Sequence, residues 1–253
     1  MTERDWQLQT PISAVVFDCD GTLTTIEGVN ELAKHHHVYD AVEAMTTEAM
    51  GQTGINPALY EKRLQLIQPS QQQIQQLAEQ YIKHRTPDSE IVIQILQRLN
   101  KKIFLLSAGM NPAVSLFGEM LRIPPSHIYA VNLFFDEQGR YLDFDHDSPL
   151  IHNNGKREIV YDLQHQYPHL LHIGDGLNDF STHDIVTRFI GYGGVYFREN
   201  LKSQCQYYIE TLSLSPILPL CLTADEHQQL TKEENQVYQK GMLAIEEQRV
   251  KVG

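Results

Sequence analysis

Short apolar runs alternate with longer stretches of helical apolar spacing along the 253-residue chain. Mostly apolar runs lie at 12–17, 102–106 and 170–173, and polar or turn residues follow each of them. Such runs are typical of buried parallel strands. Shorter strands are expected at 189–191 and 206–209. Strands that alternate with helices predict an α/β fold with a doubly wound, Rossmann-like parallel sheet.

The segment between the first two predicted strands has a different pattern, because its apolar residues recur at helical spacing. Turn residues divide it into several helices, and Ser70 is a suitable N-cap for the last of them. The predicted helices cover residues 29–36, 41–50, 57–67 and 71–84. A helical block inserted after the first strand predicts a small cap over the sheet.

Beyond residue 87 the strand and helix patterns resume. Helices are expected at 91–99, 111–121 and 156–165, and two apolar stretches around a turn predict a β-hairpin at 129–144.

These patterns divide the chain into three parts. We expect an α/β core formed by residues 1–23 and 86–222, a helical cap at 24–85, and a helical extension at 223–253. The extension is polar with sparse apolar positions. It is therefore either a partly exposed helix or an amphipathic helix that packs on the core or on a partner subunit.

Polar, reactive residues follow three of the predicted strands. Asp18 and Asp20 follow the first strand, Ser107 follows the strand at 102–106, and Asp175 follows the strand at 170–173. The carboxyl ends of parallel strands meet at one edge of a sheet, where ligands bind. We therefore expect these side chains to form one site.

The residue types in this site suit phosphoryl transfer. Asp18 can attack phosphorus as a carboxylate nucleophile, and Asp20 can protonate the leaving oxygen and later activate water. Lys156 supplies a compact positive charge. Ser107 and the backbone N–H of Gly109 are expected to donate hydrogen bonds to phosphate at a helix N-terminus.

A carboxylate nucleophile and a phosphate dianion repel each other, so the site needs a cation. Asp18, Asp175 and the backbone carbonyl of Asp20 offer hard oxygen ligands, which predicts Mg²⁺. Asp179 is expected to lie outside the coordination sphere and to hold waters or Lys156.

Composition narrows the function classes. The net charge of −12 argues against binding to nucleic acid or to an anionic membrane surface, because polyanions would be repelled. The three cysteines fit no zinc pattern and are expected to be reduced thiols. With no run long enough to cross a bilayer and a polar N-terminal stretch, a cytoplasmic location is expected.

Taken together, the motifs at 17–24, Ser107, Lys156 and 174–179 resemble the four motifs of haloacid dehalogenase phosphatases. Segments 27–33 and 63–70 resemble the cap of the phosphoserine phosphatase family. The similarity covers roughly residues 10–212. It implies an aspartyl-phosphate on Asp18, Mg²⁺ dependence and hydrolysis of O-phospho-L-serine, with a homodimer as a further expectation.

The resemblance also implies contacts with the substrate. Arg63 would pair with the substrate carboxylate, and Glu27 would bind its ammonium group. Met50 and Gly51 would line the pocket, and Asn178 would lie near the substrate. The phosphate would contact Ser107, Ala108 and Gly109.

Three positions depart from the family pattern. Ala108 stands where a glycine is usual, Met110 stands where phenylalanine is common, and Asn56 takes a position often held by an apolar pocket residue. An amide in the pocket wall could admit another small phosphorylated metabolite, or the phosphate could pass to another acceptor. A non-catalytic protein that binds a partner through 223–253 is a third hypothesis, which the intact catalytic set disfavours.

Overall fold

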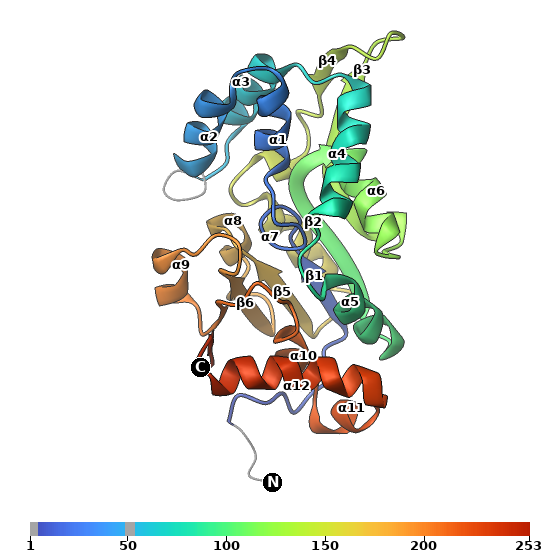
Figure 1. Ribbon diagram of the computed structural model, residues 1–253, viewed down its shortest axis with the longest axis vertical. Helices are drawn as coiled ribbons and strands as arrows, with labels where there is room; N and C mark the ends of the chain where they lie inside the picture. The colour runs from blue at the N-terminus through green and yellow to red at the C-terminus, as the bar shows by residue number, and fades with distance from the viewer. Residues whose placement is uncertain (1–4, 49–53) are drawn as a thin grey trace.

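The computed structural model describes residues 5–48 and 54–253. In this part of the chain, eight strands form one sheet in the order β4-β3-β2-β1-β5-β6-β7-β8 (Figure 1). The strands are β1 (Ala14–Phe17), β2 (Lys102–Asn111), β3 (Ile128–Phe135), β4 (Tyr141–Phe144), β5 (Leu170–Gly174), β6 (Arg188–Tyr192), β7 (Tyr207–Ile209) and β8 (Val250–Lys251).

The centre of the sheet is parallel, and its two edge strands are antiparallel. β1 pairs in parallel with β2 on one side and with β5 on the other, so Val16 lies between Phe104 and His172. β4 and β8 run antiparallel to β3 and β7. All residues of β1 and β5 are buried, as expected for strands covered on both faces. The predicted doubly wound α/β fold is confirmed.

A block of four helices follows β1, as predicted. It lies at one end of the molecule, above the carboxyl edge of the sheet (Figure 1). Ser70 starts its last helix with a capping box that includes Gln73. The helices are α1 (Gly28–His35), α2 (Tyr39–Glu48), α3 (Pro57–Ile67) and α4 (Gln71–Lys83). The last two residues of the helix predicted at 41–50 lie outside the described residues.

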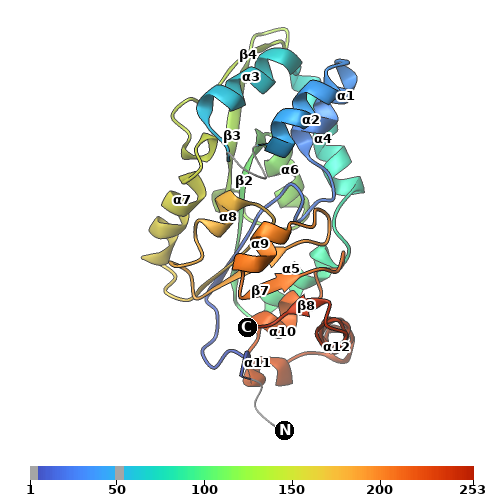
Figure 2. The ribbon, with the colours of Figure 1, turned by 90° about the vertical axis from the view of Figure 1, so that its left-hand side faces the viewer.

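The other helices cover the two faces of the sheet. α5 and α6 lie on one face and α7 and α8 on the other (Figure 2), as right-handed crossovers on either side of β1 require. These helices and two 3₁₀ turns are α5 (Ser89–Arg98), α6 (Ala113–Met120), η2 (Pro125–His127), η3 (Pro149–Ile151), α7 (Gly155–Gln164), α8 (Leu177–Phe180) and α9 (Glu199–Gln204). Within the described ranges, no helix is both long and apolar enough to cross a membrane.

β2 is longer than the sequence predicts, and this corrects one expectation. The strand continues to Asn111 and carries an irregularity between Leu106 and Met110 in its pairing with β3. The helix expected at 111–121 starts only at Ala113, since a residue that precedes proline disfavours helical geometry. Gly109 therefore lies in a bulged strand and not at a helix N-terminus.

The C-terminal segment packs on the core at the end opposite the four-helix block (Figure 1). It consists of α10 (Ile217–Cys221), α11 (Ala224–Gln228), α12 (Lys232–Glu246) and β8. Tyr238 and Met242 are buried, and β8 pairs with β7. Of the arrangements expected for the C-terminal extension, the structure therefore shows packing on the core.

Candidate active site

The predicted site residues meet in one pocket between the carboxyl edge of the sheet and the four-helix block. Nine of them line it: Asp18, Asp20, Glu27, Arg63, Ser107, Ala108, Gly109, Lys156 and Asn178. Met50 and Gly51 lie outside the described residues. The convergence follows from topology, because Asp18 and Asp175 directly follow the neighbouring strands β1 and β5.

Lys156 links the two carboxylates next to the end of β1. Its Nζ lies 2.5 Å from Oδ1 of Asp18 and 2.6 Å from Oδ1 of Asp179. Burial opposes the charge of this ammonium group, but the carboxylates of Asp179 and Asp18 outweigh it and raise the pKa of Lys156. A permanent positive charge therefore adjoins the carboxylate proposed as nucleophile.

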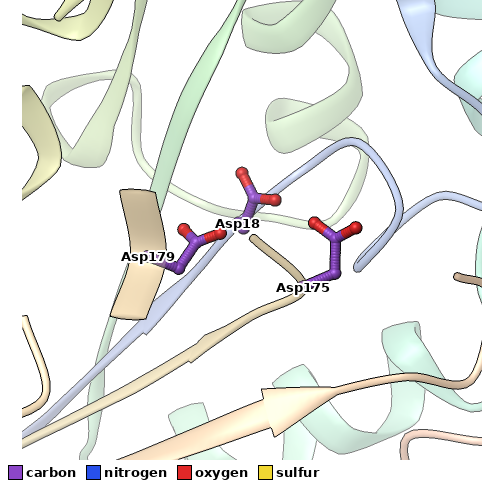
Figure 3. A group of neighbouring side chains, drawn as sticks. All are labelled: Asp18, Asp175 and Asp179. Atoms are coloured by element: carbon purple, nitrogen blue, oxygen red, sulfur yellow. The ribbon is translucent and has the colours of Figure 1, made fainter. Parts of the chain in front are cut away.

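Asp18, Asp175 and Asp179 form a buried acidic group (Figure 3). One carboxylate oxygen from each lies within 4.8 Å of the others. Burial and the neighbouring charge of Asp179 raise the pKa of Asp18, and burial raises that of Asp175 to about 6. Burial acts in the same direction on Asp179, but Lys156 and His172 lower the pKa of its carboxyl to about 2.

The residues of this acidic group fit a hard divalent cation. Their donor atoms are oxygens, which Mg²⁺ and Ca²⁺ prefer. Oδ1 of Asp175 is buried and has no hydrogen-bond partner within the described ranges. Buried polar atoms are normally paired, so this free oxygen indicates a missing ligand. Arg198 donates to Oδ2 of the same carboxylate at 2.9 Å and fixes its orientation.

Asp20 faces the four-helix block. Its Oδ1 accepts hydrogen bonds from the backbone N–H of Gly28 at 2.6 Å and from the Tyr81 hydroxyl at 2.8 Å. Burial raises the pKa of Asp20, and these hydrogen bonds only partly offset the rise. A carboxyl group that retains its proton above the usual range suits a general acid.

The irregular part of β2 forms one wall of the pocket. The backbone N–H of Gly109 donates to Oγ of Ser107 at 2.9 Å. A Cβ at position 109 would lie 2.9 Å from Oδ2 of Asp20 and from Ser107 Oγ, so the position requires glycine. Ala108 and Met110, two of the departures, both line the pocket.

Two buried groups of opposite charge line the cap side of the pocket. Arg63 is buried, and its guanidinium donates a 3.4 Å hydrogen bond to Oγ1 of Thr46. Its Nε, like Oε1 of Glu27, is buried with no partner among residues 5–48 and 54–253. Burial lowers the pKa of Arg63 and raises that of Glu27. Because isolated buried charges are costly, these groups indicate a zwitterionic ligand.

The expectation that Asn56 forms a wall of the pocket is wrong. Its side chain is exposed and caps α3 by accepting a hydrogen bond from the backbone N–H of Leu59 at 3.0 Å. Its neighbour Ile55 lines the pocket instead. Asn followed by Pro57 is a typical helix start, and this local signal was available in the sequence.

Sequence reasoning missed Tyr60, Tyr81 and Arg198, which all contact the site. Arg198 follows β6, so the strand-end rule could have indicated it. Tyr60 and Tyr81 lie in helices of the inserted block. Buried tyrosines at helical spacing look like ordinary core residues, so no sequence signal distinguished them.

Comparisons with known proteins agree with this geometry. The chain matches the haloacid dehalogenase-like hydrolase family over residues 12–182. It is 35% identical to phosphoserine phosphatase of Bos taurus and 36% identical to that of Homo sapiens. Each match spans 198 residues, which make up 78% of this chain and 88% of the relative.

Solved structures show the same fold. A phospho-aspartyl intermediate analogue of phosphoserine phosphatase matches with a TM-score of 0.69 at 25% identity, over 82% of this chain and 98% of the other. A substrate-bound phosphoserine phosphatase complex matches with a TM-score of 0.70 at 24% identity, over 83% and 98%. Since the family model and the relatives cover most of the sequence, the chain belongs to the haloacid dehalogenase-like hydrolases and, among them, to the phosphoserine phosphatase family.

Proposed function

We propose that this protein hydrolyses O-phospho-L-serine to L-serine and phosphate. The observation that carries the proposal is that Arg63 Nε and Glu27 Oε1 are buried without a partner among the described residues, in the pocket that also contains Asp18. Phosphoserine carries a carboxylate and an ammonium group, which complement a guanidinium and a carboxylate. The names of the most similar relatives support the same substrate.

The reaction uses two displacements at phosphorus. In the first, an oxygen of Asp18 bonds to phosphorus while the bond to the serine oxygen breaks, and Asp20 gives its proton to that oxygen. In the second, Asp20 takes a proton from a water molecule whose oxygen attacks phosphorus, and the bond to Asp18 breaks. The raised pKa of Asp20 supports this acid-then-base role.

The phosphate is held by the bulge and by Lys156. Ser107 Oγ and the backbone of Ala108 and Gly109 line its side of the pocket. Lys156 neutralises negative charge beside Asp18, and Asp179 holds Lys156 in place through a 2.6 Å hydrogen bond. Asn178, which lines the same pocket, contacts the substrate in this proposal.

We propose Mg²⁺ as the cofactor, held by Asp18, Asp175 and the backbone carbonyl of Asp20. When bound, the ion supplies positive charge that offsets the repulsion between a carboxylate nucleophile and a phosphate dianion. Support comes from the oxygen-only donor set and from the unpartnered Oδ1 of Asp175 among the described residues.

The four-helix block, residues 24–85, acts in this proposal as a cap that recognises the amino-acid part of the substrate. The family resemblance assigns Met50 and Gly51, which lie outside the described residues, to the same pocket. A homodimer remains our expectation from the family, and a cytoplasmic location remains our expectation from the sequence. Analytical ultracentrifugation would test the dimer.

The deciding experiment measures Mg²⁺-dependent phosphate release from L-phosphoserine and from a panel of other phosphomonoesters. Alcohol acceptors are added in parallel to detect phosphotransfer. We expect preferential hydrolysis of phosphoserine, reduced at least ~10³-fold by Asp18→Asn. Asp162→Asn, an exposed carboxyl change on α7, serves as the matched control and should retain activity.

Preference for another phosphomonoester would overturn the substrate and keep the chemistry. Activity that survives in folded Asp18→Asn protein would overturn the mechanism. Absence of turnover on the whole panel would favour a binding protein instead.

A further inference from the structure

Tyr60 lies in the pocket with a hydroxyl group that has no partner. The residue is on α3 and only 4% exposed. Its hydroxyl oxygen is buried and makes no hydrogen bond within residues 5–48 and 54–253. The ring lines the pocket beside Arg63. A buried hydroxyl normally finds a partner, because leaving it unpaired is unfavourable.

Other buried tyrosines of this protein follow that rule. Four of them have hydrogen-bonded hydroxyl groups: Tyr81, Tyr192, Tyr207 and Tyr208. The hydroxyls of Tyr81 and Tyr192 donate a hydrogen bond, and those of Tyr207 and Tyr208 accept one. The unpaired hydroxyl of Tyr60 is thus a local feature of the pocket and not a general feature of this core.

The position of the Tyr60 ring is fixed by its neighbours. Its centroid lies 5.1 Å from that of Phe144 on β4. The guanidinium carbon of Arg63 lies 5.7 Å from the same centroid. Tyr60 and Arg63 are three residues apart on one helix, so they share a face. The Tyr60 ring is therefore held in the pocket beside the guanidinium of Arg63.

Two adjacent donors suit an anionic group of the substrate. Arg63 offers N–H groups, including the unpartnered Nε, and Tyr60 offers an O–H. Burial raises the pKa of Tyr60, so the phenol stays protonated and can donate. Glu27 has the opposite charge and suits the ammonium group instead.

We propose that the Tyr60 hydroxyl donates a hydrogen bond to the carboxylate of the substrate and so determines specificity together with Arg63. This inference rests on the proposed function, because it assigns one more contact to the same phosphoserine. In this role Tyr60 acts on substrate binding.

The test compares Tyr60→Phe with the unaltered protein on L-phosphoserine and on O-phosphoethanolamine, which lacks the carboxylate. Phosphoethanolamine is also measured as a competitive inhibitor, so the comparison holds even when its turnover is slow. We expect kcat/KM for phosphoserine to fall ~10- to 100-fold, mainly through KM, as for loss of one hydrogen bond to a charged group. The value for phosphoethanolamine should not change.

Two controls separate binding from folding. Tyr39→Phe removes a cap hydroxyl that donates to Glu43 at the surface, and it should leave both substrates unaffected. The Tm of Tyr60→Phe should be unchanged or higher, since the variant removes an unpaired buried hydroxyl.

Three outcomes would overturn the inference. Equal losses on both compounds, or a lower Tm, would assign Tyr60 a structural role. An unchanged KM for phosphoserine in an active enzyme would refute the contact and leave the proposed function intact. No phosphoserine turnover by the unaltered protein would refute the contact together with the proposed function.

Discussion

Gly109 and Ala108 are neighbours in the bulge of β2, but we expect substitutions at the two positions to affect activity very differently. A Cβ at Gly109 would lie 2.9 Å from both Asp20 Oδ2 and Ser107 Oγ. The methyl group of Ala108 already lines the pocket. Gly109→Ala should therefore displace the general acid and lower kcat/KM ~100-fold, as small misplacements of catalytic groups do. Ala108→Gly, the matched control, should change it by less than ~3-fold.

Phosphate release from the preferred substrate measures the change in kcat/KM for Gly109→Ala and for Ala108→Gly. The Tm of each variant shows whether it is folded. Equal effects of the two substitutions would contradict this account of the bulge.

Under the proposed function, Glu27 should make substrate binding depend on pH. Burial and the negative charge of Asp20 raise the pKa of Glu27 well above its ordinary value. The carboxyl must be ionised to attract the substrate ammonium, so lowering the pH through this raised pKa protonates Glu27 and weakens binding. We expect KM for phosphoserine to rise as pH falls, more steeply than KM for phosphoglycolate, which lacks an ammonium group.

Initial rates across a pH series measure this difference. Because both compounds carry a titrating phosphate, its contribution cancels in the ratio of their KM values. Glu27→Gln should remove the pH dependence of that ratio. If the ratio stays pH-dependent in the variant, a titrating group other than Glu27 causes the effect.

At the scale of elements, helix α3 has a capping residue at its start and carries residues that line the pocket. Asn56 accepts a hydrogen bond from the backbone N–H of Leu59, and its side chain is exposed. Asn56→Ala should therefore lower the free energy of unfolding by ~0.5–2 kcal/mol. Substrate preference should not change, because Ile55 and not Asn56 lines the pocket.

Chemical denaturation measures this loss, and Asn56→Ser, which preserves a capping oxygen, is the control. A changed substrate preference with unchanged stability would restore Asn56 to the pocket wall.

Most elements were predictable from local patterns. α3 coincides with the predicted helix at 57–67, and β4 coincides with the second strand of the predicted hairpin. The local pattern failed at β2, where the apolar run ends at Leu106 but pairing with β3 continues at Met110 and Asn111. Hydrogen bonds to a neighbouring strand extend an element beyond its apolar run, and no local pattern reports them.

At the scale of the whole molecule, a buried ion pair connects the C-terminal segment to the sheet. Lys101 Nζ lies 2.6 Å from Glu226 Oε1, and the Lys101 side chain is 1% exposed. Glu226→Gln would leave the lysine buried without its counter-ion and should cost ~3–5 kcal/mol of unfolding free energy. The active site lies at the opposite end of the molecule from this ion pair, so kcat should not change.

Glu234→Gln is the matched control. Glu234 is 12% exposed and pairs with Arg98, whose side chain is 42% exposed, so we expect its loss to cost only ~1 kcal/mol. A glutamine can still complete the capping box at either position. Denaturant titration measures the loss of unfolding free energy in both variants. Similar losses would show that the burial of Lys101 does not determine how much stability Glu226→Gln removes.

The sequence by itself determined the parallel centre of the sheet, the inserted helices and the meeting of Asp18, Ser107 and Asp175. Apolar periodicity reports which elements form, and parallel strands place their carboxyl ends at one edge. The chemistry of the site followed from the residue types at those ends. The family resemblance supplied Arg63 and Glu27, which the structure places in the same pocket.

Only the tertiary structure decided how the cap meets the core. Asp20 accepts its hydrogen bond from Tyr81, 61 residues further along the chain, and Tyr60 brings an unpaired hydroxyl to Arg63. β8 joins the sheet from the far C-terminal segment. Contacts of this kind depend on how distant segments pack, and local periodicity encodes only which face of each segment is buried.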